Sequence, residues 1–455
     1  MKAVYSLNGV RELVRWSGVV WQAIHLASAS IVVLVLYMVQ ARAWGPEAFG
    51  WYNYLFSLAA VGGVLADFGL DFLTAKHAAS EGPGIPRKLL RFKALLLLTV
   101  AGLFSLVAVS FETKFRPPFA ALGGGVLLLS CTTFMNGILR GLERLDVEAK
   151  IGLIQKVAFV GLSLWGVVSC SGTLLWVGGC YLASQAIGLG LTLASLCNGL
   201  RTCPSMGEGS SSWRSPDSKA CSILEWGQAP AVPSLPAIAE RNPTVRNVFK
   251  EAWPLFAVTF LSFLALRFDL FLIQWLKGPD AVGLYAAGFR FVEGLSYGAA
   301  AYLAALFPRL VKAKDDPGRW LSLTSRSTVL LAAAGLLGAV VLWVAAPLTM
   351  TPLLGGAFEA SGPVLQGLSL GIPVLFVGLL LGHVLISQSR QKAYAWALLL
   401  GIAATVVTDL WAVPLWGAIG AVLGFWARLL VVLAVLAASV RRHARASKEH
   451  KASGP

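Results

Sequence analysis

The stretch WGPEAFGWY, Trp44 to Tyr52, returns later in the chain as KGPDAVGLY, Lys277 to Tyr285. Glycine, proline, an acid, alanine, glycine and tyrosine fall in register, and the members of each pair are 233 positions apart. Both copies lie in short gaps between long apolar runs. Glycine and proline interrupt a helix, and an acid suits the first turn of the next helix. The repeat therefore predicts one helix-hairpin connector in each half of a duplicated chain. We also expect Tyr52 and Tyr285 at the membrane interface, where aromatic rings act as anchors.

Around these connectors the composition is that of an integral membrane protein. Of the 455 residues, 57% are hydrophobic and 13% are charged, and the mean hydropathy is +0.72. Apolar stretches of about 20 residues, long enough to cross a bilayer as a helix, recur along the chain. We predict an all-α polytopic membrane protein with about twelve transmembrane helices, near 17–41, 50–73, 90–111, 119–139, 151–170, 174–197, 252–276, 283–307, 321–346, 363–386, 393–412 and 417–440.

The basic residues are distributed unequally between the two sides of this topology. Of the 37 lysines and arginines, 30 lie on the side that holds both termini, 4 lie on the other side, and 3 lie inside spans. This asymmetry predicts an inner (plasma) membrane protein with both termini in the cytoplasm. The charge is scattered over many loops, so nucleic acid is not an expected partner. The basic tail suits anionic membrane lipid.

A polar segment rich in serine, proline and glycine divides the chain into two halves of six spans each. We predict an N-terminal six-helix lobe at 1–200, a cytoplasmic linker at 201–248, a C-terminal six-helix lobe at 249–440 and a basic tail at 441–455. The six cysteines show no metal-ligand spacing, and the outward loops are too short to carry catalytic groups. The sequence therefore predicts no metal site, no catalytic residue and no enzymatic activity.

Ionisable residues inside spans mark the candidate binding site, because each is costly in hydrocarbon and needs a reason to be there. Three arginines stand out, and two polar residues share helix faces with them. The predicted substrate-binding residues are Arg267, Arg290, Arg428, Gln274 and Tyr297. No nearby residue in the sequence neutralises Arg428, which favours an anionic ligand. A polar substrate path and a set of buried structural ion pairs both remain open explanations.

The acidic residues inside the spans form a second group. Asp269 and Glu293 flank the second connector at depths that allow charge pairing across the hairpin. Arg267 and Asp269 are two positions apart and point in nearly opposite directions, so we expect only one of them to face the next span. In the first half, Asp67 and Asp71 lie one turn apart, and either a cation or Lys76 could pair with them. These four acids are predicted to serve ion coupling, to H⁺ or Na⁺, or structural pairing.

Three segments resemble the Wzx-type polysaccharide-biosynthesis flippases of the MOP superfamily. ARAWGPEAFGWYNYLFSLAAVGGVLADFGL, Ala41 to Leu70, is similar to the family's opening span pair, although Phe49 replaces the usual tyrosine of the connector. FDLFLIQWLKGPDAVGLYAAGFRF, Phe268 to Phe291, resembles its seventh and eighth spans. GILRGLERLDVEAKIGLI, Gly137 to Ile154, resembles its fourth-to-fifth connection.

This resemblance implies two six-helix lobes, MOP/MATE-like, around a central cavity lined by basic residues. It implies a flippase that moves a polyprenyl-diphosphate-linked oligosaccharide, such as an O-antigen or exopolysaccharide unit, from the inner to the outer leaflet by alternating access. Membrane lipid and the polysaccharide polymerase or chain-length machinery are then the expected partners. A multidrug or cation antiporter of the same superfamily, a lipid II flippase and a membrane polysaccharide polymerase are the alternatives.

Overall fold

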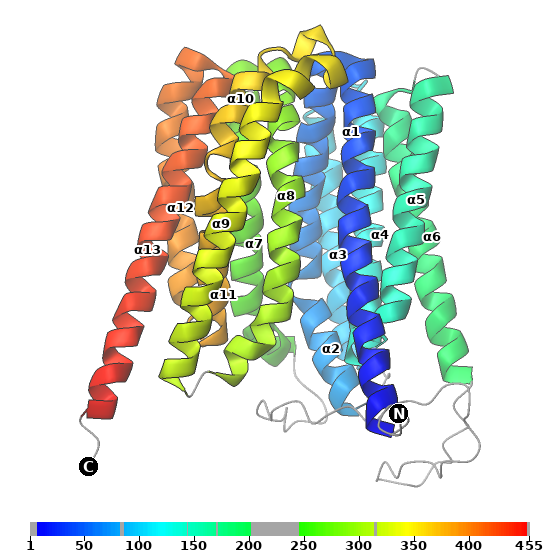
Figure 1. Ribbon diagram of the computed structural model, residues 1–455. Helices are drawn as coiled ribbons and strands as arrows, with labels where there is room; N and C mark the ends of the chain where they lie inside the picture. The colour runs from blue at the N-terminus through cyan, green and yellow to red at the C-terminus, as the bar shows by residue number, and fades with distance from the viewer. Residues whose placement is uncertain are drawn as a thin grey trace.

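The computed structural model describes the backbone of residues 7–81, 86–142, 144–169, 172–201, 245–313 and 316–452. Within these ranges the chain is helical and contains no strand. The helices run side by side as one tall bundle, with the N- and C-termini at the same end (Figure 1). We call that end the terminal end, and the opposite end, which holds both sequence repeats, the connector end.

The first half of the chain supplies the helices on one side of the bundle and the second half supplies the other side (Figure 1). The first half comprises α1 (Leu7–Asp67), α2 (Leu70–Glu81), α3 (Arg87–Val109), α4 (Arg116–Gly141), α5 (Leu145–Ser169) and α6 (Leu174–Arg201). The second half comprises α7 (Val245–Lys277), α8 (Pro279–Lys312), α9 (Pro317–Thr349), the short η1 (Met350–Leu354) and η2 (Gly356–Phe358), α10 (Ser361–Ser369), α11 (Ile372–Ser387), α12 (Gln391–Trp416) and α13 (Ala418–Ala452).

The repeated motif forms connectors, as predicted. Gly45 has a φ of 73° and interrupts α1, while Gly278 has a φ of 81° immediately before α8. Glycine adopts these left-handed conformations without a steric penalty, and each following proline begins the next helix. Tyr37 and Tyr52, on either side of Gly45, have ring centroids 6.1 Å apart, so α1 folds back on itself as a hairpin. This single element therefore contributes two spans.

Twelve crossings follow from these elements, which confirms the predicted fold class. Nine helices of the described part are long and apolar enough to span a membrane, or ten when α10 and α11, bent by 48°, count as one. The hairpin in α1 adds one more crossing. The last is α8, whose 34 residues are ample for a span although it carries several charges. The second predicted span is broken, since Phe68 and Gly69 have φ values of 44° and 71°.

The two connectors pack directly against each other where the halves meet. A Cβ atom added at Gly50 would lie 1.8 Å from the carbonyl oxygen of Pro279, and one added at Gly283 would lie 2.0 Å from that of Pro46. These four positions are related by the same 233-residue offset, so the contact is a reciprocal one across a pseudo-twofold axis. Gly50 and Gly283 are thus required for close approach of the two halves, whereas Gly45 and Gly278 are required for the turns.

Further contacts join the halves at each end of the bundle. At the connector end, Arg42 Nη1 donates to the Pro352 carbonyl oxygen at 2.9 Å, and the Phe49 and Phe358 rings pack edge to face at 6.0 Å. Nearer the terminal end, the Phe68 ring at the α1–α2 break stacks on Phe256 of α7, with centroids 4.2 Å apart. The break therefore places an aromatic side chain of the first half against the second.

The structure revises the position of the two motif tyrosines and adds detail at the predicted linker and tail. Tyr52 and Tyr285 are not interfacial anchors, because both side chains are fully buried where the two halves pack together. Helix α7 begins at Val245, inside the segment predicted as a linker, and residues 202–244 of that linker lie outside the described part. Helix α13 continues through most of the predicted tail to Ala452.

Candidate functional site

Arg267, Arg290 and Glu293 form an ion-pair cluster on facing helices, which we call the bridging cluster. Arg267 Nη2 on α7 lies 2.5 Å from Glu293 Oε1 on α8, and Arg290 Nη1 lies 2.7 Å from Glu293 Oε2. Helix depth allowed pairing across the hairpin, and the structure contains it between Arg267 and Glu293. One carboxylate serves two guanidinium groups, so the cluster carries a formal net charge of one positive unit.

The first half of the chain completes this cluster from α1. Arg290 Nη2 donates a hydrogen bond to Asn53 Oδ1 at 2.6 Å, and its guanidinium carbon lies 4.0 Å from the centroid of the Tyr37 ring. The amide orientation of Asn53 is fixed, because its nitrogen donates to the Phe49 carbonyl oxygen at 2.8 Å. Arg290 thus belongs to the second half but is held by the first.

The bridging cluster has two N–H donors without partners in the described part of the chain, and neighbouring side chains are partly exposed. Arg267 Nη1 and Arg290 Nε are buried, and neither has a hydrogen-bond partner among the described residues. The Glu293 side chain is 20% exposed, and Tyr297, one turn further along α8, is 41% exposed. A buried donor without a partner costs about 1–3 kcal/mol, so the arrangement favours a ligand with acceptor atoms.

Arg428 belongs to a different group, which we call the interior cluster, with Asp269, Tyr285 and Asp409. Arg428 Nη2 lies 3.5 Å from Asp269 Oδ2, and the Tyr285 hydroxyl donates to the same oxygen at 2.7 Å. The fold therefore supplies the partner that the sequence did not show for Arg428. It also corrects the phase argument, because Asp269 and Arg267 both contact α8 side chains, which lie at different positions around that helix.

Asp409 on α12 is the least satisfied member of the interior cluster. It is fully buried, and neither carboxylate oxygen has a hydrogen-bond partner within the described ranges. Its Oδ1 atom would lie 1.9 Å from a Cβ atom at Gly424, so α12 and α13 approach closely here only because that residue is glycine. With one arginine and two carboxylates, the interior cluster has a formal net charge of one negative unit.

The remaining predicted residues lie apart from these two clusters. Gln274 lies two turns along α7 from Arg267, toward the connector end, and its side-chain oxygen is buried without a partner in the described structure. Asp67 pairs with Lys93 Nζ at 3.1 Å, and Asp71 pairs with Arg140 Nη1 at 3.3 Å. Both of these pairs lie within the first half.

The sequence analysis did not select Asn53 and Tyr37, which contact Arg290, or Lys93, which pairs with Asp67. Lys93 is buried, and it also donates to the Ala66 carbonyl oxygen at 3.0 Å, beside the break between α1 and α2. Each of these residues is polar or amphipathic within an apolar span, and that signal alone could have singled it out. What the sequence lacked was the partner, since Asn53 and Arg290 are 237 positions apart.

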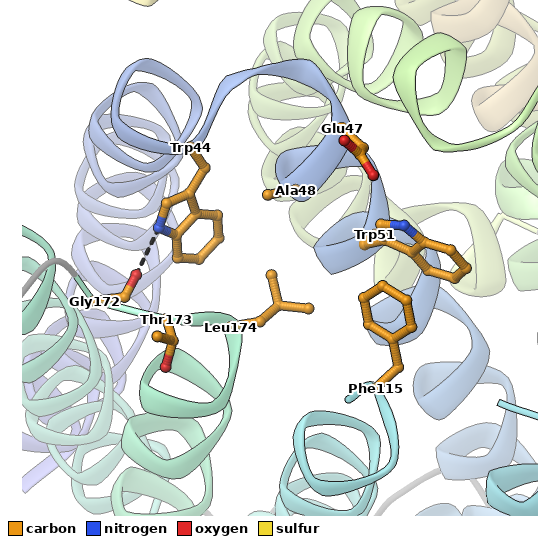
Figure 2. Close-up of a pocket in the computed structure, with 8 residues that line it drawn as sticks. All are labelled: Trp44, Glu47, Ala48, Trp51, Phe115, Gly172, Thr173 and Leu174. Atoms are coloured by element: carbon orange, nitrogen blue, oxygen red, sulfur yellow. Dashed lines mark hydrogen bonds between the residues drawn. The ribbon is translucent and has the colours of Figure 1, made fainter. Parts of the chain in front are cut away.

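A pocket of about 350 Å³ lies elsewhere, at the connector end of the first half (Figure 2). Trp44, Trp51 and Phe115 supply aromatic walls, and the Trp44 indole nitrogen donates to the Gly172 carbonyl oxygen at 2.7 Å. Trp51 and Phe115 stack with centroids 4.1 Å apart. None of the predicted site residues lines this pocket.

Solved structures with the same fold include transporters of the MOP superfamily and a lipid II flippase. An inward-facing multidrug-resistance MATE transporter of the MOP superfamily is 12% identical, with a TM-score of 0.70 over 96% of this chain and 99% of its own. The lipid II flippase MurJ in an inward closed conformation is 12% identical, with a TM-score of 0.67 over 92% of this chain and 87% of its own. A MOP superfamily transporter from Pyrococcus furiosus, described by the reverse polarity of its binding pocket, is 12% identical, with a TM-score of 0.65 over 95% of this chain and 96% of its own.

Sequence comparison gives the family. No curated protein sequence matches this chain. A family model described as polysaccharide biosynthesis protein matches residues 16–314, which include both connectors, Asn53 and all of the bridging cluster. The match covers well over half of the chain, and the chain therefore belongs to the polysaccharide biosynthesis protein family.

Proposed function

We propose that this protein is a flippase that carries a polyprenyl-diphosphate-linked oligosaccharide from the inner to the outer leaflet, with the diphosphate held at the bridging cluster. The observation that carries the proposal is the net positive charge of Arg267, Arg290 and Glu293, together with the two buried N–H donors that lack partners. A diphosphate is anionic, presents several acceptor oxygens and cannot cross hydrocarbon unaided.

The family and the fold support the general part of this assignment, which is a flippase or transporter in polysaccharide biosynthesis. The family is one of polysaccharide biosynthesis, and the similar structures are named as multidrug transporters and a lipid II flippase. With both termini in the cytoplasm, the negative-inside potential favours outward movement of two negative charges by about 4–5 kcal/mol per 100 mV. Coupling to H⁺ or Na⁺, and contact with a polymerase or chain-length protein, belong to the same proposal.

A multidrug or cation antiporter is the second candidate, and the interior cluster is the observation that favours it. With both carboxylates ionised, Asp269 and Asp409 would give that cluster a formal net negative charge, which suits a cation. However, Asp269 and Asp409 are fully buried, whereas the bridging cluster has exposed side chains beside it. The accessible charge therefore favours an anionic substrate.

The test replaces Arg267 and Arg290 singly with glutamine, which removes the charge but keeps hydrogen-bonding groups. We expect at least a tenfold loss of surface polysaccharide at equal protein level, because a neutral amide replaces a charge-assisted contact. Arg390→Gln is the matched control, since Arg390 is exposed and lies far along the sequence in the α11–α12 turn. Normal polysaccharide export by both variants would refute the proposal, and loss of ethidium efflux instead would support the antiporter.

A further inference from the structure

The guanidinium of Arg290 has one edge that is half occupied. Its Nη1 is committed to Glu293, its Nη2 is held by Asn53, and its Nε has no partner among the described residues. In a planar guanidinium, Nε–H and one Nη2–H point the same way and form the fork that binds two oxygens of a phosphate. Asn53 therefore occupies Nη2, one of the two donors on this edge, and leaves the other donor, Nε, available for a ligand.

Asn53 contributes a neutral acceptor to this fork. The bond from Arg290 to Asn53 has an ionised donor only, whereas a bond to phosphate joins an ionised donor to an ionised acceptor and gains the attraction of opposite charges. A phosphate that binds both Nε and Nη2 would replace one bond to a neutral amide with two bonds to anionic oxygens and would satisfy the buried Nε. The Asn53 oxygen is then displaced, although its nitrogen remains tied to the Phe49 carbonyl oxygen.

The bond between Asn53 and Arg290 is also a tie between the two halves of the molecule. Asn53 follows the first connector by a few residues, and Arg290 follows the second. On the same stretch of each helix, Gly50 and Gly283 pack against the opposite connector, and Phe49 packs against Phe358. The tie therefore reinforces the contact that closes the connector end.

We propose that a phosphate group displaces Asn53 from the Nε–Nη2 edge of Arg290, and that losing this tie loosens the connector end. Asn53 is in this sense a positioning residue that occupies the anion site until the ligand arrives. The inference rests on the proposed function, because it assigns the anion to Arg290. It adds that Asn53 competes with the anion for Arg290, and that anion binding leads to separation of the two halves at the connector end.

Substitutions at one position should change affinity in opposite directions. The measurement is the binding of inorganic pyrophosphate to the full chain in lipid nanodiscs. Asn53→Ala removes the competitor, and we expect binding to be roughly ten- to a hundredfold tighter, the size of one hydrogen bond to a charged group. Asn53→Asp supplies an anionic competitor, and we expect binding to be at least tenfold weaker. Asn136→Ala, which removes a buried amide bonded to Thr192 within the first half, is the control and should leave affinity unchanged.

The conformational part is tested by the distance between spin labels on the two halves. Labels at Glu112 and Glu359, both exposed at the connector end, report its opening in a background with serine in place of the native cysteines. We expect pyrophosphate to lengthen this distance in the unsubstituted chain. We expect Asn53→Ala to lengthen it without ligand, and Asn53→Asp to keep it short with ligand.

The possible failures are distinguishable. Pyrophosphate binding that is unaffected by Arg290→Gln overturns the proposed function itself. Binding that is lost in Arg290→Gln but equal in Asn53→Ala, Asn53→Asp and the unsubstituted chain overturns only the displacement of Asn53. Weaker binding in both Asn53 variants also overturns it, since a purely structural role gives losses of the same sign. Altered affinity with an unchanged label distance overturns the link to the connector end.

Discussion

Tyr285 shows how one residue of the repeat acquires a role that its counterpart lacks. Its hydroxyl donates to Asp269 Oδ2 at 2.7 Å, inside a region closed to solvent, where Arg428 is the other partner of that carboxylate. The position 233 residues earlier is Tyr52, and the position matching Asp269 is Leu36. The same tyrosine thus packs in one half and binds a charged group in the other.

This difference predicts the cost of removing the Tyr285 hydroxyl. Tyr285→Phe should lower the free energy of unfolding by about 1.5–3 kcal/mol, because a buried carboxylate loses a donor. Tyr302→Phe is the matched control, since its hydroxyl bonds to the neutral Ser327 hydroxyl at 2.9 Å. That variant should lose about 0.5–1.5 kcal/mol. Thermal denaturation in detergent measures both, and an equal loss in the two variants would contradict the role of Asp269.

At the scale of elements, the connectors combine a turn with a contact between the two halves. Gly45 and Gly278 allow the turn through their positive φ angles. Gly50 and Gly283, five positions later, allow the backbone of the opposite connector to approach. A motif read from the sequence as a turn signal therefore contains two glycines with two distinct physical functions.

The reciprocal contact predicts equal effects at two distant positions. Gly50→Ala and Gly283→Ala should each destabilise the closed connector end by about 1–3 kcal/mol, since each methyl group meets a proline carbonyl oxygen. The Glu112–Glu359 label distance should increase in both variants. Gly102→Ala is the control, because a Cβ atom there meets nothing within 4 Å. A lengthened distance in only one of the two variants would argue against the pseudo-twofold contact.

At the scale of the whole molecule, the charges are segregated. The second half contains the bridging cluster, with a formal net positive charge, and the interior cluster, with more carboxylates than arginines. In the first half, the intramembrane acids Asp67 and Asp71 pair with Lys93 and Arg140. The two halves therefore share a helix arrangement but differ in their charged residues. The bridging cluster, which is the accessible one, lies where α8 meets α1.

The orientation of the whole molecule is a further prediction. The excess of basic residues on the terminal side should place both termini in the cytoplasm. A green fluorescent protein fused after Pro455 should fluoresce, and alkaline phosphatase inserted after Glu112 should be active, because that loop lies at the connector end. The reverse pattern would invert the topology and, with it, the direction of the proposed transport.

The sequence by itself determined the class of fold, the number of spans, the two connectors and the membership of the family. These properties depend on the lengths of apolar segments, on glycine and proline at turns and on the spacing of the repeat. All three follow directly from the order of residues in the chain. It also identified the charges that form the bridging cluster and showed that pairing across one hairpin was feasible, because the depth of a residue follows from its position along the helix.

Only the tertiary structure decided which partners these residues have. Arg428 meets Asp269, which precedes it by 159 positions, and Arg290 meets Asn53, which precedes it by 237. It also buried both motif tyrosines, since the connectors pack on each other and are not left at the membrane surface. The Asn53–Arg290 contact and the burial of the tyrosines arise from the docking of the two halves, whereas the Arg428–Asp269 contact arises from the packing of α13 against α7 within the second half. The hydrophobic periodicity of a single helix specifies neither kind of contact.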